Sequence, residues 1–219
     1  MRSFGSRTPR GSAAAGAALA ALSLLGAPPR LAAQALYHGC GMAGSAAAVK
    51  WQALNRLKNR FTAPGPAEMD GAATLAALLA PGDDRNRWSE ARGAVVTGYV
   101  RSVKPGGFET SNCLAKAREF RDTHIELVPD PMDGSALTVI VEVTPRWRAI
   151  LAARGVDWST ATLRHQLLGR WVRVTGWLMF DAEHANAAAN TAPGHPRDWR
   201  ATAWEVHPIT DLRVVPKPD

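Results

Sequence analysis

The second half of the chain consists of short segments in which apolar and polar residues alternate. Five such segments are rich in β-branched and aromatic residues, a pattern typical of β-strands with one buried face. They cover residues 93–103, 123–128, 137–144, 170–180 and 201–215. Residues 145–155 and 159–169, between the third and fourth segments, have helical spacing instead, and Pro145 and Ser159 stand where helices favour their first residue and their cap.

The order of three strands, a helical interval and two strands is that of the oligonucleotide/oligosaccharide-binding (OB) fold, a five-stranded Greek-key barrel. We therefore predict a mainly β protein with helices, in which an OB-type barrel covers residues 92–219. Small barrels of the SH3 type lack the helical interval and fit the pattern less well. Helical spacing in residues 46–61 and 72–82 predicts a helical N-terminal extension over residues 36–91. Its helices are too short to be stable alone, so we expect them to pack on the barrel.

Residues 1–35 have the pattern of a cleavable signal peptide. Three arginines and no acidic residue in the first ten positions precede an Ala-rich apolar stretch, and Ala33 and Ala35 fit a small-x-small cleavage site. The apolar stretch is too short and too rich in alanine for a membrane span. We predict cleavage after Ala35, no stable membrane span afterwards, and a mature protein located in the periplasm or outside the cell.

Export changes the interpretation of the charge. The whole chain carries 26 Lys and Arg against 19 Asp and Glu, but four of the arginines lie in residues 1–35. Without them 22 basic and 19 acidic residues remain, which lowers the net charge from +7 to about +3. Non-specific binding to nucleic acid phosphates needs a larger surplus of positive charge than this.

The two cysteines, Cys40 and Cys113, both belong to the predicted mature protein. In an oxidising compartment two cysteines more often form a disulfide than a reactive pair. A bridge between them would tie the helical extension to the barrel. It would close a loop of about 70 residues, which the chain-entropy model values at about 4 kcal/mol.

Strand alternation places a set of polar and aromatic side chains on one face of the barrel. His124 and Glu126 are two residues apart in the second segment, and so are Glu205 and His207 in the fifth, so each pair points to one side of its strand. We expect this face on the outer surface of the barrel or at its mouth. The candidate ligand-binding residues on the face and in the long loop after the fourth segment are His124, Glu126, Glu142, Arg173, Trp177, His184, Trp199, Glu205 and His207.

Three hypotheses for this face stay open. The first is cross-strand ion pairing on a solvated surface, with Glu142 or Glu126 against Arg173. The second is a binding module that holds single-stranded nucleic acid or glycan with the barrel face and two long loops, residues 104–122 and 181–199. Cations and aromatics in the loops suit nucleic acid, and the mixture of tryptophan and carboxylates suits glycan equally well.

The third hypothesis is metal-assisted hydrolysis, which requires three or four convergent His, Asp or Glu ligands. The weak candidates for such ligands are His124, Glu126, Glu205 and His207, together with Asp181, Glu183 and His184. The chain contains neither a His-Glu-x-x-His nor a Cys-x-x-Cys motif. We therefore favour a binding module over an enzyme and predict no cofactor. An envelope structural or protein-interaction role, with an envelope protein as partner, is the remaining alternative.

Five motifs of the mature chain are LNRLKNR, DTHIELV, VEVTPRWR, GWLMFDAEHAN and WRATAWEVHPIT. They resemble those of a family of uncharacterised bacterial exported proteins with a predicted OB-type barrel. The resemblance implies the fold and export, but no reaction. Members of similar pattern often have Cys-Asn-Cys where this chain has Ser111, Asn112 and Cys113. The resemblance therefore implies no shared metal or redox role for this segment, and it leaves Cys40 as the partner of Cys113.

Overall fold

The structure is a computed structural model that describes Met1, residues 37–134 and residues 138–218. The predicted cleavage site and nearly all of the predicted signal peptide lie outside the described residues. Within the described part of the chain, no helix is both long and apolar enough to cross a membrane.

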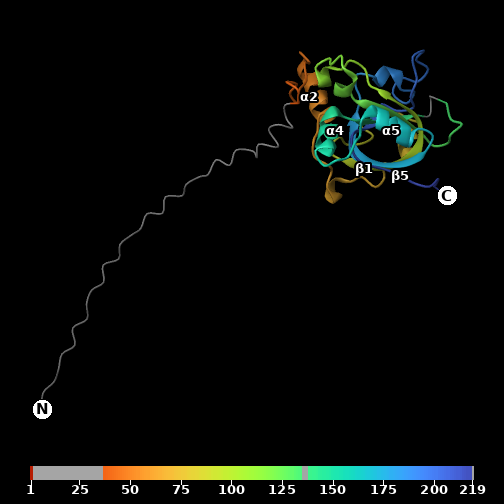
Figure 1. The fold of residues 1–219 in the computed structure, drawn as a ribbon. Helices are drawn as coiled ribbons and strands as arrows, with labels where there is room; N and C mark the ends of the chain where they lie inside the picture. The colour runs from red at the N-terminus through yellow and green to blue at the C-terminus, as the bar shows by residue number, and fades with distance from the viewer. Residues whose placement is uncertain (2–36, 135–137, 219) are drawn as a thin grey trace.

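Five strands close into a barrel in the order β1-β2-β3-β5-β4 (Figure 1). The strands are β1 (Gly93–Pro105), β2 (Thr123–Val128), β3 (Val139–Val143), β4 (Trp171–Phe180) and β5 (Trp204–Val214). All neighbours are antiparallel except β3 and β5, which are parallel. The long β1 closes the barrel because its first half pairs with β4 and its second half with β2. The predicted five-stranded OB-type barrel is confirmed.

Two helices, α4 (Pro145–Ala152) and α5 (Thr160–Leu167), lie between β3 and β4 as predicted. Ser159 caps α5, because its hydroxyl accepts a hydrogen bond from the backbone N–H of the third residue after it. Leu163 and Leu167, one turn apart on α5, are buried in the hydrophobic core of the barrel.

Alternation along the strands separates an apolar interior from a polar side, as predicted. Val141, Val174 and Val206 belong to the buried apolar core. A solvated surface on the opposite side of β2 and β3 was the first of the three open hypotheses, and for these two strands it is wrong. All six residues of β2 and all five of β3 are buried, because the N-terminal extension and the loops after β1 and β4 cover this part of the barrel.

The N-terminal extension contains α2 (Val49–Lys58), the short 3-10 helix η1 (Pro66–Glu68) and α3 (Leu75–Leu79). Helix α2 contacts β5 and the 3-10 helix η2 (Thr110–Asn112) in the loop after β1. A disulfide joins the predicted pair, Cys40 and Cys113, with an S–S distance of 2.07 Å. The extension is thereby fastened to the loop that follows β1. Further short 3-10 helices are η3 (Arg118–Phe120) before β2 and η5 (Ala185–Ala187) after β4.

Candidate functional site

Four titratable side chains lie next to one another on the covered side of the barrel. His124 of β2 is the cross-strand partner of Glu142 of β3. In the parallel pair β3 and β5, Ile140 is opposite Glu205, so His207, two residues further along, lies beside Glu142. The strand register therefore brings these imidazoles and carboxylates together, and all four are buried.

The covering segments add four more buried charged side chains, which are Lys58, Asp122, Asp181 and Arg200. Together with His124, Glu142, Glu205 and His207 they form what we call the polar layer. Arg200 is 1% exposed and bridges Asp181 and Glu205. Its Nη2 lies 3.1 Å from Asp181 Oδ2, and its Nη1 donates to Glu205 Oε1.

Lys58, the last residue of α2, is the second buried cation of the polar layer. Its Nζ lies 2.7 Å from Glu109 Oε2 and 3.2 Å from Glu183 Oε2. Burial lowers the pKa of Lys58, but the surrounding carboxylates outweigh burial and hold it well above its ordinary value. Lys58 is therefore charged, and it ties α2 to the loops after β1 and β4.

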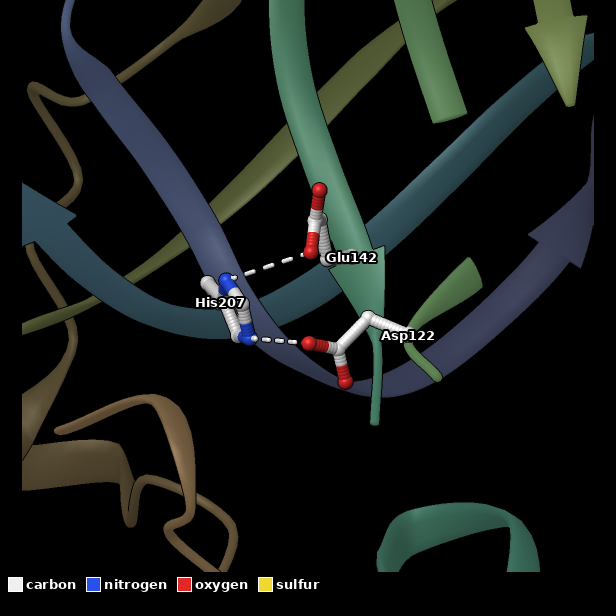
Figure 2. A group of neighbouring side chains, drawn as sticks. All are labelled: Asp122, Glu142 and His207. Atoms are coloured by element: carbon white, nitrogen blue, oxygen red, sulfur yellow. Dashed lines mark ion pairs between the residues drawn. The ribbon is translucent and has the colours of Figure 1, made fainter. Parts of the chain in front are cut away.

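The two imidazoles of the polar layer are held by carboxylates. His124 Nδ1 lies 2.8 Å from Glu142 Oε1, and His207 Nδ1 lies 3.2 Å from Glu205 Oε2. Figure 2 shows His207 between Glu142 and Asp122, with its Nε2 4.0 Å from Asp122 Oδ2 and its Nδ1 3.6 Å from Glu142 Oε2. Each ring thus lies within reach of more than one carboxylate.

Burial and these contacts raise the pKa values of some of the buried groups and lower those of others. Burial lowers the pKa of His207, but hydrogen bonding to Glu205 and the nearby carboxylates outweigh burial and raise it to about 9. Burial raises the pKa of Asp122 to about 7. For Glu142 burial acts upward, yet the hydrogen bond from His124 and the charge of His207 bring its pKa down to about 2. Buried groups with pKa values shifted in opposite directions occur in functional sites and also in structural ion-pair networks.

Several polar atoms of the layer have no hydrogen-bond partner among the described residues. They are Asp122 Oδ1, His124 Nε2, Glu142 Oε2, Arg200 Nε and His207 Nε2. An unsatisfied buried polar atom costs about 1–3 kcal/mol. Buried atoms of this kind are satisfied by ordered water, an ion or a ligand, so they mark places in the layer where such a partner can bind.

A pocket of about 430 Å³ opens onto the polar layer. Five carboxylates line it, those of Glu109, Glu142, Asp181, Glu183 and Glu205. Trp199, which is half-buried, lines the same pocket and lies close to His124, with ring centroids 5.8 Å apart. A larger pocket of about 580 Å³ beside α4 and α5 contains none of the polar layer and is mostly apolar, so the smaller pocket is the stronger candidate for specific chemistry.

Seven of the nine candidate residues gather at or near this pocket. His124, Glu142, Glu205 and His207 belong to the polar layer, and His184 and Trp199 line the pocket. Glu126 lies at the edge, where its Oε1 accepts a hydrogen bond of 2.7 Å from Lys104 Nζ. Of the weak metal candidates, only His207 belongs to a group of described residues whose potential ligand atoms all lie within 4.8 Å of one another, and its companions there are Asp122 and Glu142.

Arg173 and Trp177 do not join the pocket. Arg173 is exposed, and its cross-strand partners are Thr97 and Arg213. The cross-strand ion pair of Arg173 with Glu142 or Glu126, which the first hypothesis proposed, is therefore not formed. Trp177 was expected to be exposed, but the N-terminal extension buries it. Its Nε1 donates to the carbonyl of Thr62 over 2.7 Å.

Sequence reasoning missed two central members of the polar layer, Asp122 and Lys58. A signal for Asp122 was present, because it precedes His124 and Glu126 at the same two-residue spacing. Lys58 gave no such signal. Its burial depends on how α2 packs against the loops, which no local pattern specifies.

The chain matches no protein-family model, and no curated protein matches it in sequence. The resemblance to a family of exported proteins therefore stays a prediction. Function has to be inferred from the geometry of the polar layer and its pocket.

Proposed function

We propose that the protein is an exported binding module whose pocket holds a neutral, polyhydroxylated ligand, such as a sugar unit of a glycan. One observation carries this proposal. Five carboxylates and Trp199 line the pocket, while each Lys and Arg among the lining residues already has a carboxylate partner.

The pairing of the cations argues against a phosphate ligand. Lys58 contacts Glu109, Arg200 contacts Asp181, and Lys104 contacts Glu126. A phosphate would have to compete with these carboxylates for each cation, and the slightly positive net charge of the predicted mature chain gives little additional attraction. Single-stranded nucleic acid is therefore the weaker of the two ligands considered.

A neutral polyol fits the same pocket better. Its hydroxyl groups donate to carboxylate oxygens and accept from lysine or arginine N–H groups, so no net charge is needed. Trp199 supplies an apolar surface beside these polar groups, as many small-molecule sites require.

Export to an oxidising compartment is part of the proposal. The disulfide between Cys40 and Cys113 supports it, because disulfides persist mainly in exported proteins. A location in the periplasm or outside the cell would give the pocket access to envelope or extracellular glycans.

The proposal is tested by calorimetric titration with soluble cello- and chito-oligosaccharides, and with oligo-dT at low and high salt. We expect saturable binding of at least one sugar series, and a loss of about tenfold or more in Trp199→Ala, since tenfold corresponds to about 1.4 kcal/mol. Trp171→Ala is the matched control, because Trp171 is also half-buried but packs near Tyr99, away from the pocket.

Salt-sensitive binding of oligo-dT with no sugar binding would replace the glycan by nucleic acid as the ligand. If neither ligand bound and the protein retained a specific envelope protein, the interaction role would be the better account.

A further inference from the structure

Asp122, Glu142 and His207 bring three metal-type ligands together beside the pocket (Figure 2). They come from the residue before β2, from β3 and from β5. One oxygen or ring nitrogen from each of the three lies within 4.8 Å of those of the other two. None of these residues is more than 4% exposed, so the convergence is a property of the interior and not of a crowded acidic surface.

In each of the three side chains, one polar atom forms a hydrogen bond with a neighbouring residue and the other forms none among the described residues. The held contacts are Asn112 Nδ2 to Asp122 Oδ2 at 2.9 Å, His124 Nδ1 to Glu142 Oε1 at 2.8 Å, and His207 Nδ1 to Glu205 Oε2 at 3.2 Å. Asp122 Oδ1, Glu142 Oε2 and His207 Nε2 have no hydrogen-bond partner among the described residues. Outer contacts of this kind, a carboxylate on the second nitrogen of a histidine above all, orient metal ligands in proteins.

The two carboxylates of this group also lack a permanent cation. Within the described part of the chain, their ion-pair partners are the imidazoles of His124 and His207, and neither pairs with Lys or Arg. Buried carboxylates are normally paired with a cation or bound to a metal. The buried cations of the polar layer contact other carboxylates.

We propose that Asp122, Glu142 and His207 bind a divalent transition-metal ion of the zinc class. One imidazole and two carboxylates are a donor set that Zn²⁺ accepts, and three protein ligands leave a fourth position for water or a ligand. Metal–ligand distances of about 2.0–2.2 Å place tetrahedral ligand atoms about 3.4 Å apart, so the side chains close on the ion by about 1 Å. Because Glu142 also lines the pocket, the ion lies next to the place where the proposed glycan binds.

The competing arrangement is a hydrogen-bonded network whose charges are balanced by protons alone, and this network binds no metal. The test uses tag-free protein with its disulfide intact, stripped with EDTA and titrated with ZnCl₂ by calorimetry. We expect one ion bound per chain. Co²⁺ is the second probe, and its visible absorption bands are expected to report a four-coordinate site with nitrogen and oxygen ligands.

Three variants locate the site. Asp122→Asn and His207→Gln are expected to weaken Zn²⁺ binding by more than about tenfold. Tenfold is the lower end of the loss in metal affinity when only an outer contact is removed, so removal of a ligand should cost more. His165→Gln is the control, because it removes an exposed imidazole on α5 that does not line the pocket, and it should leave the affinity unchanged. If His207→Gln does not fold, the near-isosteric Asp122→Asn and the Co²⁺ spectrum of the unmodified protein still show whether the metal site exists.

The proposal is overturned if the folded protein binds no Zn²⁺, if Asp122→Asn binds it as tightly as the parent, or if His165→Gln weakens binding as much as Asp122→Asn does. Sugar binding is measured separately, so failure of the metal site leaves the proposed glycan pocket open to its own test.

Discussion

At the scale of single residues, Arg200 carries one of the largest energetic consequences in the protein. Its guanidinium is almost fully buried between Asp181 and Glu205. Removing one partner of a buried ion pair leaves the others as uncompensated charges in a medium that solvates them poorly. The cost of such a change is much larger than the net contribution of the intact pair.

We therefore predict that Arg200→Met lowers the free energy of unfolding by about 3–5 kcal/mol in urea denaturation. Arg173→Met, on the exposed side of β4, is the control and should change it by no more than about 0.5 kcal/mol. Equal effects of the two substitutions would show that the Arg200 contacts are not formed in solution.

His124 and Glu126 predict how stability depends on pH. Burial lowers the pKa of His124, but the neighbouring carboxylates of Glu126 and Glu142 outweigh it and raise the value from 6.5 to about 9. This histidine contributes stability that is fully present below pH 6.5 and is lost as the pH rises through 9. The neighbouring His124 and Lys104 lower the pKa of Glu126 from 4.5 to about 2, so its contribution is present above pH 4.5 and is lost as the pH falls through 2.

For metal-free protein in EDTA, we expect the melting temperature to decline between pH 6.5 and 9. His124→Gln should make this decline shallower, whereas His165→Gln, at an exposed position on α5, should keep the slope of the parent protein. A decline of unchanged slope in His124→Gln would mean that His124 is not protonated in the folded state.

At the scale of elements, the N-terminal extension is what helps to bury the polar side of the barrel. It covers β5 with α2, inserts Lys58 among carboxylates and is joined to the loop after β1 by the disulfide. Without this cover, the polar side of the barrel would be an ordinary solvated surface, on which ion pairs contribute little.

The disulfide gives a prediction at the same scale. Replacing Cys40 and Cys113 by serine opens a loop with a sequence separation of 73 residues. The chain-entropy model assigns to this loop a loss of about 4 kcal/mol in the free energy of unfolding, measurable by urea denaturation. The circular dichroism of the folded protein should be retained, because the barrel strands are paired independently of the bridge. A loss below about 1 kcal/mol would contradict the assignment.

The elements themselves were largely predictable, because they depend on local pattern. Alternation marked all five strands, and proline and serine marked the helix starts between β3 and β4. The same alternation correctly put Glu142 and His207 on the side away from the core. It could not reveal that this side is covered, since the burial of Trp177 and Lys58 depends on contacts with segments more than 50 residues away in sequence.

At the scale of the whole molecule, an apolar barrel core and a buried polar layer lie on opposite sides of the same strands. The apolar core is sufficient to explain why the chain folds as a barrel. The polar layer also contains buried atoms without a hydrogen-bond partner among the described residues and a carboxyl whose pKa is raised, and both features lower stability. Natural proteins retain such unfavourable arrangements where they bind or react.

The central claim is that the polar layer is kept for ligand binding, and a substitution of Asp122 tests it most directly. Burial raises its pKa from 3.8 to about 7, so above pH 7 the folded protein holds an ionised carboxylate that the unfolded chain accommodates better. Asparagine removes the charge, and its side-chain oxygen can still accept the hydrogen bond from Asn112. The decisive measurement is the free energy of unfolding of Asp122→Asn against the parent protein in EDTA at about pH 8, chosen above that pKa. If the polar layer is kept for ligand binding, Asp122→Asn should be more stable than the parent protein. If the layer is kept for structure, Asp122→Asn should be equally stable or less stable.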